Sequence, residues 1–169
     1  MGDPGEISRM WFRAWVNAVD NAATGWPNAF HLSQSNRTGL FIMGGSDWRD
    51  YVVTSTITMR LGRSFGLVAR VRGLRRYYGF VLTANQSARI VRRCGESTVL
   101  GELEFPWEFE RPYEFRLEVF GKEIAGSLDG KQILKICDTA GGVDSGGFGF
   151  ICDEGLILSD EVCVEPVGR

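Results

Sequence analysis

The sequence predicts an all-β domain made of two packed antiparallel sheets, and three observations support this fold class. The chain has 169 residues, enough for one domain with a sizeable core. Its 22 glycines and only 5 prolines separate short stretches in which apolar and polar residues alternate. About a dozen such stretches are present, more than one open sheet holds easily, whereas two packed sheets bury an apolar side of each.

The chain organises as a single domain over residues 1–169, with 1–25 as a lead-in and 26–166 as the sandwich. Within the lead-in, apolar residues recur at helical spacing over 7–19, which favours a short helix there. The strand pattern begins after it. Residues 29–33 and 39–43 predict an opening hairpin that turns at Ser35-Asn36-Arg37.

The remaining strands are expected where every second residue is apolar. The cleanest example is 113–119, in which Tyr, Phe, Leu and Val alternate with Glu and Arg. Asp129-Gly130 is a strong signal for a two-residue hairpin turn. The expected strands are 51–60, 66–72, 77–83, 88–93, 98–103, 113–119, 123–128, 132–136, 146–151 and 162–165.

The strand pair 66–72 and 77–83 carries the side chains most suited to recognition. Successive strand residues point to opposite faces, so Arg70 and Arg72 are expected to share a face that Tyr78 reaches from the next strand. If that face is concave and open, the guanidinium groups can clamp hydroxyl, carboxylate or phosphate groups. The alternative is that these arginines form ion pairs with acidic residues of neighbouring strands.

Two further residues extend this expected ligand-binding surface. Arg92, on the following hairpin, continues the row of guanidinium groups, and Trp107 lies in a loop at a strand end, where it would form a wall. Trp48 and Tyr77 are the other aromatic side chains suited to stacking, although tryptophan in a domain of this size is commonly part of the core.

Charge and cysteine content exclude several classes of protein. The net charge is −2, so no overall basic excess points to nucleic acid, although arginines gather between residues 60 and 93. No apolar segment reaches the roughly 20 residues of a membrane helix. The four cysteines match no zinc spacing, and three of them, Cys137 and Cys152 included, have apolar surroundings, so we expect buried reduced thiols. With no secretory signal at the start, we expect a cytoplasmic location.

Several short motifs follow one another in a recognisable order along the chain. They are Trp48-x-x-Tyr51, Gly66-Leu67-Val68-Ala69-Arg70, Tyr77-Tyr78, Tyr113 to Val119, Gly121 with Asp129-Gly130, Asp138, and Gly146 to Phe150. Over roughly residues 26–166 this order resembles that of the concanavalin A-like, laminin-G-type jelly roll. It is similar to the domain appended to bacterial ADP-ribosylglycohydrolase-family proteins and to carbohydrate-binding modules of the same fold.

The resemblance implies a non-catalytic module that binds a glycan, a ribosyl-type ligand or a sugar nucleotide, accessory to a linked or associated glycohydrolase domain. The hydrolase's own metal-binding helical domain is absent from this sequence, so its activity is not implied. No cofactor is expected; some members of the fold hold a structural calcium, and that is the only metal the resemblance suggests. Apolar sugar faces stack on aromatic rings and hydroxyl edges bond to planar charged groups.

Two other functions remain open. Glu102 and Glu104 lie two residues apart on one strand, which allows a sandwich-fold glycoside hydrolase, although the third acid of such strands is missing. His31 is the only histidine and has no nucleophile motif beside it, which argues against a Ser-His-Asp or Cys-His site. The third hypothesis is a structural or protein-interaction domain without a small ligand.

Overall fold

The computed structural model describes residues 16–18, 21–25 and 29–167, and within these ranges the chain forms thirteen strands and no helix. The expected helix over 7–19 lies mostly outside the described residues, and its last part is a strand instead. The strands are β1 (Val16–Ala18), β2 (Asn21–Gly25), β3 (Ala29–Met43), β4 (Tyr51–Leu61), β5 (Ser64–Gly73), β6 (Arg76–Thr83), β7 (Ser87–Cys94), β8 (Glu96–Glu104), β9 (Pro112–Phe120), β10 (Glu123–Leu128), β11 (Lys131–Cys137), β12 (Gly147–Ser159) and β13 (Cys163–Pro166).

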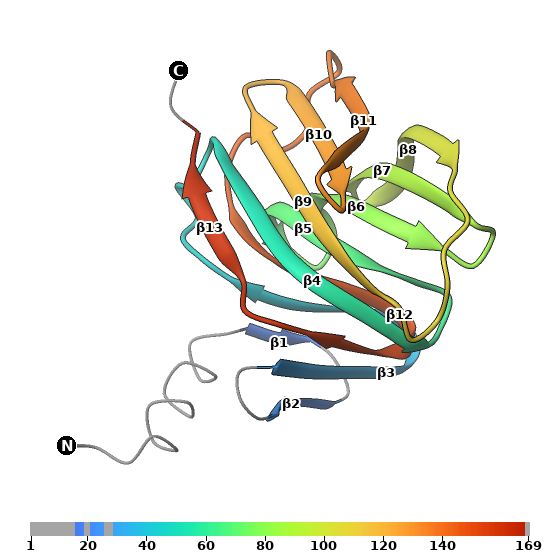
Figure 1. The fold of residues 1–169 in the computed structure, drawn as a ribbon. Coiled ribbons are helices and arrows are strands. Elements are labelled where there is room, and N and C mark those ends of the chain that lie inside the picture. Colours follow the sequence, from blue (N-terminus) through green and yellow to red (C-terminus); the bar gives the residue numbers. More distant parts are fainter. Residues whose placement is uncertain (1–15, 19–20, 26–28, 168–169) are drawn as a thin grey trace.

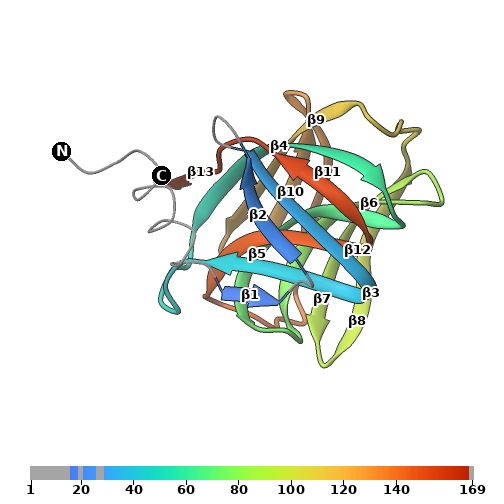
Figure 2. The same cartoon turned by 90° about the horizontal axis from the view of Figure 1, so that it is seen from below.

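The strands form a two-layer antiparallel sandwich (Figure 1). One layer has the order β3-β12-β5-β6-β7-β8, and the other has the order β13-β4-β9-β10-β11. Strand β12 joins the layers, because its first half pairs with β5 and its last residues pair with β4. Seen from below, β1 and β2 lie along β3, each pairing with a different half of that strand (Figure 2).

The main core lies between the layers and is rich in aromatic rings. Phe115 of β9 meets Phe65 of β5 and Phe80 of β6 edge-on, with ring centroids 5.3 and 5.7 Å apart. On the facing strand β10, a Cβ atom at Gly126 would lie 2.5 Å from the Phe80 ring. Glycine is therefore needed at 126 for the two layers to approach this closely.

The predicted hairpin over residues 29–43 is wrong, because β3 is one continuous strand. Both of its halves pair with the same partner, β12, and the register shifts where Thr38 faces Asp153 and Gln34 faces Gly155. The residues expected to turn, 35–37, are thus the extra residues of a bulge. Turn-forming residues fit a bulge as well as a turn, and only the partner strand distinguishes the two.

Strand β5 also contains a bulge, and it changes the faces to which side chains point. Arg70 has a φ of 51°, and the pairing with β6 shifts register between Ala69 and Gly73. Before the bulge, Ala69 packs in the main core and Val68 on the opposite face; after it, Val71 joins Val68. The simple alternation expected over 66–72 therefore fails at Arg70.

The outer face of the β5–β6 region is apolar rather than polar. A second buried cluster lies there, separate from the main core. Its members are Leu40, Ile42, Val68, Val71, Tyr77, Val81 and Ile151. Both faces of this layer therefore carry buried hydrocarbon, and the expected face of exposed guanidinium and tyrosine groups is wrong.

Candidate functional site

The expected binding residue Arg70 is a buried structural group. Only 3% of its surface is exposed. Its guanidinium donates to the backbone carbonyls of Arg49 and Gly121 at 2.8 Å and to that of Val143 at 3.3 Å. Its Nη2 lies 3.1 Å from Oδ1 of Asp50. Arg70 thus links three loops at one end of the sandwich by hydrogen bonds. The prediction that its side chain is exposed to a ligand is therefore wrong.

Tyr51, the first residue of β4, belongs to the same hydrogen-bond network. Its hydroxyl oxygen accepts the backbone N–H of Arg70 at 2.6 Å and lies 2.9 Å from the carbonyl oxygens of Gly146 and Gly147. Burial raises the pKa of Tyr51 to about 12, although the Arg70 hydrogen bond and charge partly oppose the rise. The hydroxyl therefore stays protonated and acts as a structural bridge.

Tyr78 and Arg92 also face inward, toward Asp138. The Tyr78 hydroxyl donates to Oδ2 at 2.7 Å and Arg92 Nη1 donates to Oδ1 at 2.6 Å, while Arg92 also reaches the carbonyl of Gly141 at 3.1 Å. Burial would raise the pKa of Asp138, but the bonds from Arg92 and Tyr78 outweigh it and hold that pKa below its usual value. Tyr78, 2% exposed, is not an open floor residue.

Among the predicted ligand-binding residues, only Arg72 is well exposed. Its Nη2 donates to the carbonyl oxygen of Ser46 at 3.1 Å. Trp107 is 4% exposed and its indole N–H donates to the carbonyl of Thr83 at 2.6 Å. The structure thus brings Tyr78 and Arg92 together on Asp138, but it does not assemble the expected open floor and wall.

Of the three candidate stacking residues, Trp48 alone presents its ring to solvent. Tyr77 and Trp107 are buried, whereas Trp48 is 40% exposed. Its indole stacks on Phe148 with centroids 5.7 Å apart and planes 12° apart, and Tyr51 meets it edge-on at 6.0 Å. These contacts hold the Trp48 ring rigidly while part of it stays accessible.

A groove of about 300 Å³ opens beside Trp48. It is lined by Trp48, Arg49, Asp50, Tyr51, Val164 and Pro166, and so lies between the loop before β4 and the strand β13. Its volume is at the lower end of the range of small-ligand sites, about 300–1,000 Å³. We call it the Trp48 groove.

The Trp48 groove combines an aromatic ring with an oriented carboxylate. Oδ1 of Asp50 is occupied by Arg70 and by the backbone N–H of Gly121, at 3.1 and 2.8 Å. Among the described residues, Oδ2 of Asp50 and the indole N–H of Trp48 form no hydrogen bond. An acceptor, a donor and an exposed guanidinium on Arg49 therefore stand beside an apolar ring, which suits a ligand with both hydroxyl groups and C–H faces.

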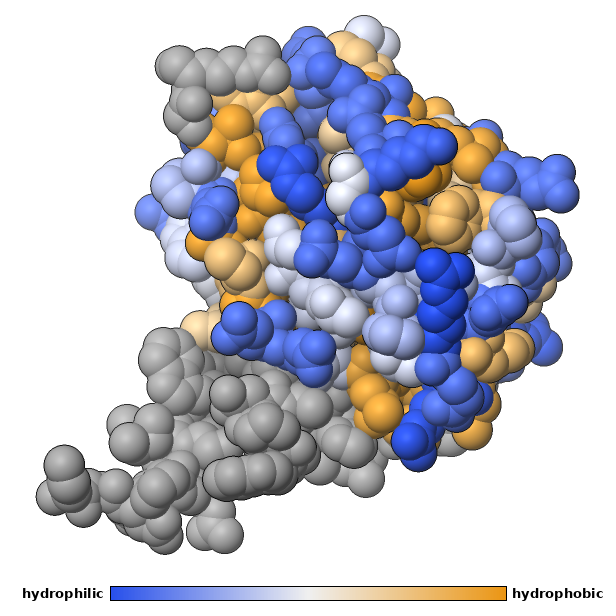
Figure 3. Space-filling view, viewed as in Figure 1, coloured by the Kyte–Doolittle hydropathy of each residue, from blue (hydrophilic) through white to orange (hydrophobic). Residues whose placement is uncertain are grey.

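Two other hollows lack an aromatic ring as exposed as that of Trp48; the first contains Phe105 beside Glu104 and Asp129, but the Phe105 ring is partly buried against the main core. One of about 500 Å³ lies between the end of β8 and the β10–β11 hairpin, and another of about 200 Å³ lies over β9, β10 and β11. The second belongs to the largely hydrophilic face seen in Figure 3. On that face Glu118 pairs with Arg116 and Glu123 pairs with Lys135, so its charges are already matched.

The two carboxylates considered for catalysis lie on the edge strand β8. Glu102 forms an ion pair with Arg89 at 3.1 Å, and this hydrogen bond lowers the pKa of Glu102. A glycosidase general acid needs a raised pKa instead. Glu104 is exposed and lines the 500 Å³ hollow. No observation on this strand supports hydrolysis.

In the part of the chain that the structure describes, no three His, Cys, Asp or Glu side chains gather to hold a metal ion. No helix there is long and apolar enough to cross a membrane. Cys152 is buried as expected, but Cys94, Cys137 and Cys163 are exposed, so the expectation of burial was wrong for these three. The side chain of His31 lies outside the described residues.

Sequence reasoning missed Arg49 and Asp50 as site residues and ranked Trp48 low. The available signal was the run Trp48-Arg49-Asp50-Tyr51, which places an aromatic ring, a cation and a carboxylate at the entry to a strand. A loop residue next to a rigid strand is a common position for binding groups.

Comparisons with known proteins address the fold. No protein-family model matches the chain, and no curated protein is similar enough to match it. Among solved structures, the carbohydrate-binding module CBM66 from Bacillus subtilis has a TM-score of 0.80 at 17% identity, covering 90% of this chain and 95% of that one. A Bacillus subtilis protein of unknown function with a galectin-like fold has a TM-score of 0.69 at 14% identity, covering 94% and 91%.

A third similar structure is the GH43 protein BlXynB from Bacillus licheniformis, with a TM-score of 0.66 at 13% identity. The likeness covers 91% of this chain but only 37% of that longer protein. At such low identities the likeness concerns the fold alone. The chain therefore has the concanavalin A-like jelly-roll sandwich fold that a carbohydrate-binding module and a galectin-like protein share with it.

Proposed function

We propose that this chain is a non-catalytic carbohydrate-binding module whose ligand occupies the Trp48 groove. The observation that carries the proposal is the partly exposed Trp48 ring, fixed on Phe148 beside the anchored carboxylate of Asp50. A sugar ring can lay a C–H face on the indole while its hydroxyl groups donate to Asp50 and accept from Arg49. A preformed site of this kind avoids the entropy loss of ordering loops.

The groove suits a single sugar unit, including a ribosyl group, because its volume is only about 300 Å³. An accessory role to a glycohydrolase domain, such as one of the ADP-ribosylglycohydrolase type, is supported by the GH43 protein, in which a similar sandwich is part of a longer chain. Free thiols on the surface suit a reducing, cytoplasmic compartment in a bacterium.

The test is a glycan array followed by calorimetry on the sugars that are retained. Trp48→Ala should weaken binding about tenfold or more, because it removes the stacking surface. Arg49→Gln should weaken binding less, because its side chain is exposed and its backbone carbonyl still accepts from Arg70.

The matched control is Phe109→Ala, which removes an aromatic ring that is 51% exposed at the opposite end of the sandwich. It should leave affinity unchanged. If no sugar is retained at millimolar concentration, the proposal fails, and a protein-interaction domain becomes the better hypothesis. Hydrolysis of a retained glycan that Glu102→Gln abolishes would favour the glycosidase alternative instead.

A further inference from the structure

The arginines of the described chain fall into two groups, those with a carboxylate partner and those without. Seven of them form ion pairs with Asp or Glu. These are Arg60, Arg63, Arg70, Arg89, Arg92, Arg111 and Arg116. Among the arginines whose side chains the structure describes, the others form no ion pair, and they are Arg49, Arg72, Arg75, Arg76 and Arg93.

The unpaired arginines share one end of the sandwich. Arg75 lies in the β5–β6 turn, and the strand ends beside the β5–β6 and β7–β8 turns carry the other three. We call these four residues the arginine rim: Arg72, Arg75, Arg76 and Arg93. The two turns are joined, because Arg76 pairs with Cys94 in the strand register and the backbone N–H of Gly95 donates to the carbonyl of Arg75 at 2.8 Å. Four positive charges therefore come from two turns in direct contact.

Backbone carbonyls orient this rim without neutralising it. Arg76 Nη2 donates to the carbonyl of Gly142 at 3.1 Å and Arg93 Nε to that of Gly95 at 3.3 Å. Asp47, in a nearby loop, and Glu96, at the start of β8, are exposed, but neither comes within ion-pair distance of a rim guanidinium. A guanidinium held on one side by a carbonyl keeps its remaining N–H groups free for an anion.

The arginine rim contacts the loop that forms one wall of the Trp48 groove. Arg72 donates to the carbonyl of Ser46, in the loop that carries Trp48 two residues later. Arg49, the fifth unpaired arginine, lines the groove itself. A ligand that leaves the groove along this loop therefore meets guanidinium groups next.

We propose that the ligand is an anionic glycan, whose carboxylate, sulfate or phosphate groups bind the arginine rim while a sugar unit occupies the Trp48 groove. The glycan part rests on the proposed function; the anion part rests on the rim alone. Planar guanidinium groups bind each of these anions bidentately. The overall charge of −2 disfavours a nucleic-acid partner, whose binding relies on a broad basic surface.

The test compares dextran, carboxymethyl dextran and dextran sulfate, which share one backbone and differ in charge, with inorganic polyphosphate as the phosphate probe. Wild-type protein should bind at least one charged probe about tenfold more tightly than dextran. The variant Arg75→Gln/Arg76→Gln should lose about three- to tenfold of that affinity. Raising the salt concentration from about 50 to 300 mM should reduce the same affinity.

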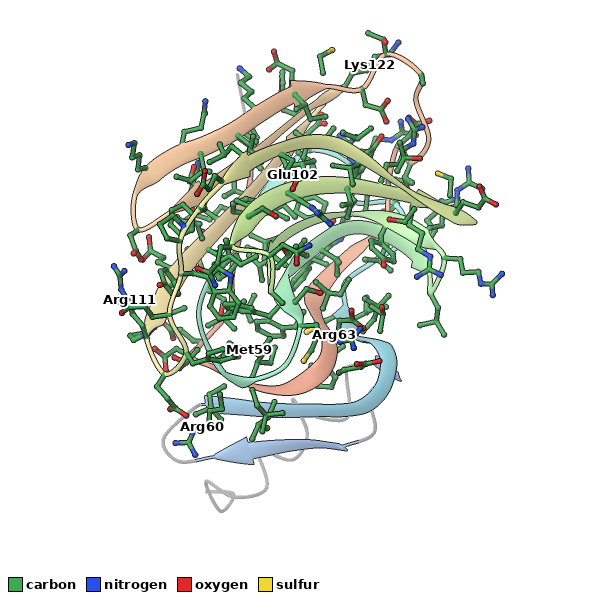
Figure 4. All side chains as sticks on the ribbon, turned by 90° about the vertical axis from the view of Figure 1, so that its right-hand side faces the viewer. Met59, Arg60, Arg63, Glu102, Arg111 and Lys122 are labelled. Carbon is green, nitrogen blue, oxygen red and sulfur yellow. The ribbon has the colours of Figure 1, made fainter. Side chains whose placement is uncertain are left out.

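The matched control is Arg60→Gln/Arg111→Gln, which removes the same charge. Both of these arginines are ion-paired, and Figure 4 shows them on one side of the molecule, away from Lys122 in the turn after β9. This control should keep the affinity for charged probes. A loss equal to that of the rim variant would show a general charge effect and overturn the proposal.

The two proposals fail in different ways. If Trp48→Ala abolishes the binding of a neutral sugar but charged and neutral probes bind equally, the anion proposal is wrong and the carbohydrate module stands. If charged probes depend on the rim but Trp48→Ala changes no affinity, the groove proposal is wrong and the anion site stands. A single-stranded oligonucleotide that binds more tightly than every charged glycan probe would overturn the glycan assignment.

Discussion

Arg70 and Arg72 are two residues apart on strand β5, yet they occupy opposite environments. Arg70 is buried and bonded to Asp50 and to three backbone carbonyls. Arg72 is exposed and bonded to a single carbonyl, that of Ser46. The bulge at Arg70 separates them, because it turns one guanidinium under the loops and leaves the next outside.

Arg70 and Arg72 show that the role of an arginine follows from its partners rather than from its residue type. A buried guanidinium whose N–H groups are used in the fold has little left for a ligand. An exposed guanidinium without a carboxylate has its charge available. The same end of this sandwich therefore combines a rigid interior of arginine and tyrosine bonds with an outer rim of unpaired charge.

The largest effect is expected for Arg70→Met. Removing the guanidinium leaves the carbonyls of Arg49, Gly121 and Val143 without this donor, which should lower the free energy of unfolding by about 3–5 kcal/mol. Urea unfolding measures the difference. The control Arg72→Met should change stability by less than about 0.5 kcal/mol. Equal effects of the two variants would remove the distinction between buried and exposed arginine.

A smaller loss is expected for Tyr51→Phe. This variant deletes the hydroxyl that bridges Arg70 to the carbonyls of Gly146 and Gly147, which should lower the unfolding free energy by about 1–3 kcal/mol. If Arg70 and Tyr51 act as one unit, the double variant should be less destabilised than the sum of the two singles. Strict additivity in a double-mutant cycle would contradict that.

Asp138→Asn tests the buried network of Tyr78, Arg92 and Asp138 through the pH dependence of stability. The folded pKa of Asp138 is lowered, so its stabilising effect is present above the unfolded pKa of about 3.9 and disappears as pH falls toward the lower folded value. The substitution should cost about 1–3 kcal/mol at pH 7 and less near pH 3. Urea unfolding at both pH values checks this, and a pH-independent loss would argue against a charged Asp138.

The smallest stability effect is expected for Arg75→Gln/Arg76→Gln. These side chains are exposed and have no carboxylate partner in the described chain, so the unfolding free energy should stay within about 0.5 kcal/mol of wild type. Thermal and urea unfolding both measure it. A marked destabilisation would mean that the rim serves the fold, and would weaken its assignment as an anion site.

Most strands were predictable because alternation along one strand needs no knowledge of its neighbours. The strand at 113–119 and the hairpin at Asp129-Gly130 appear as β9 and as β10 with β11. The failures lie at bulges, in β3 near residues 35–37 and in β5 at Arg70, where the extra residues are defined by a partner strand distant in sequence. The site was misplaced because alternation does not show which face is covered: Tyr78 faces the main core with its register partner Ala69, and loops close over Arg70.

Periodicity, glycine spacing and turn residues were enough to establish an all-β sandwich, because these signals act between neighbours along the chain. The burial of each arginine depends on segments that are distant in sequence. The loops around Asp50, Gly121 and Val143 close over Arg70, whereas Arg72 stays exposed. Burial and ion pairing are properties of three-dimensional contact, so the surface available to a ligand follows from packing rather than from local pattern.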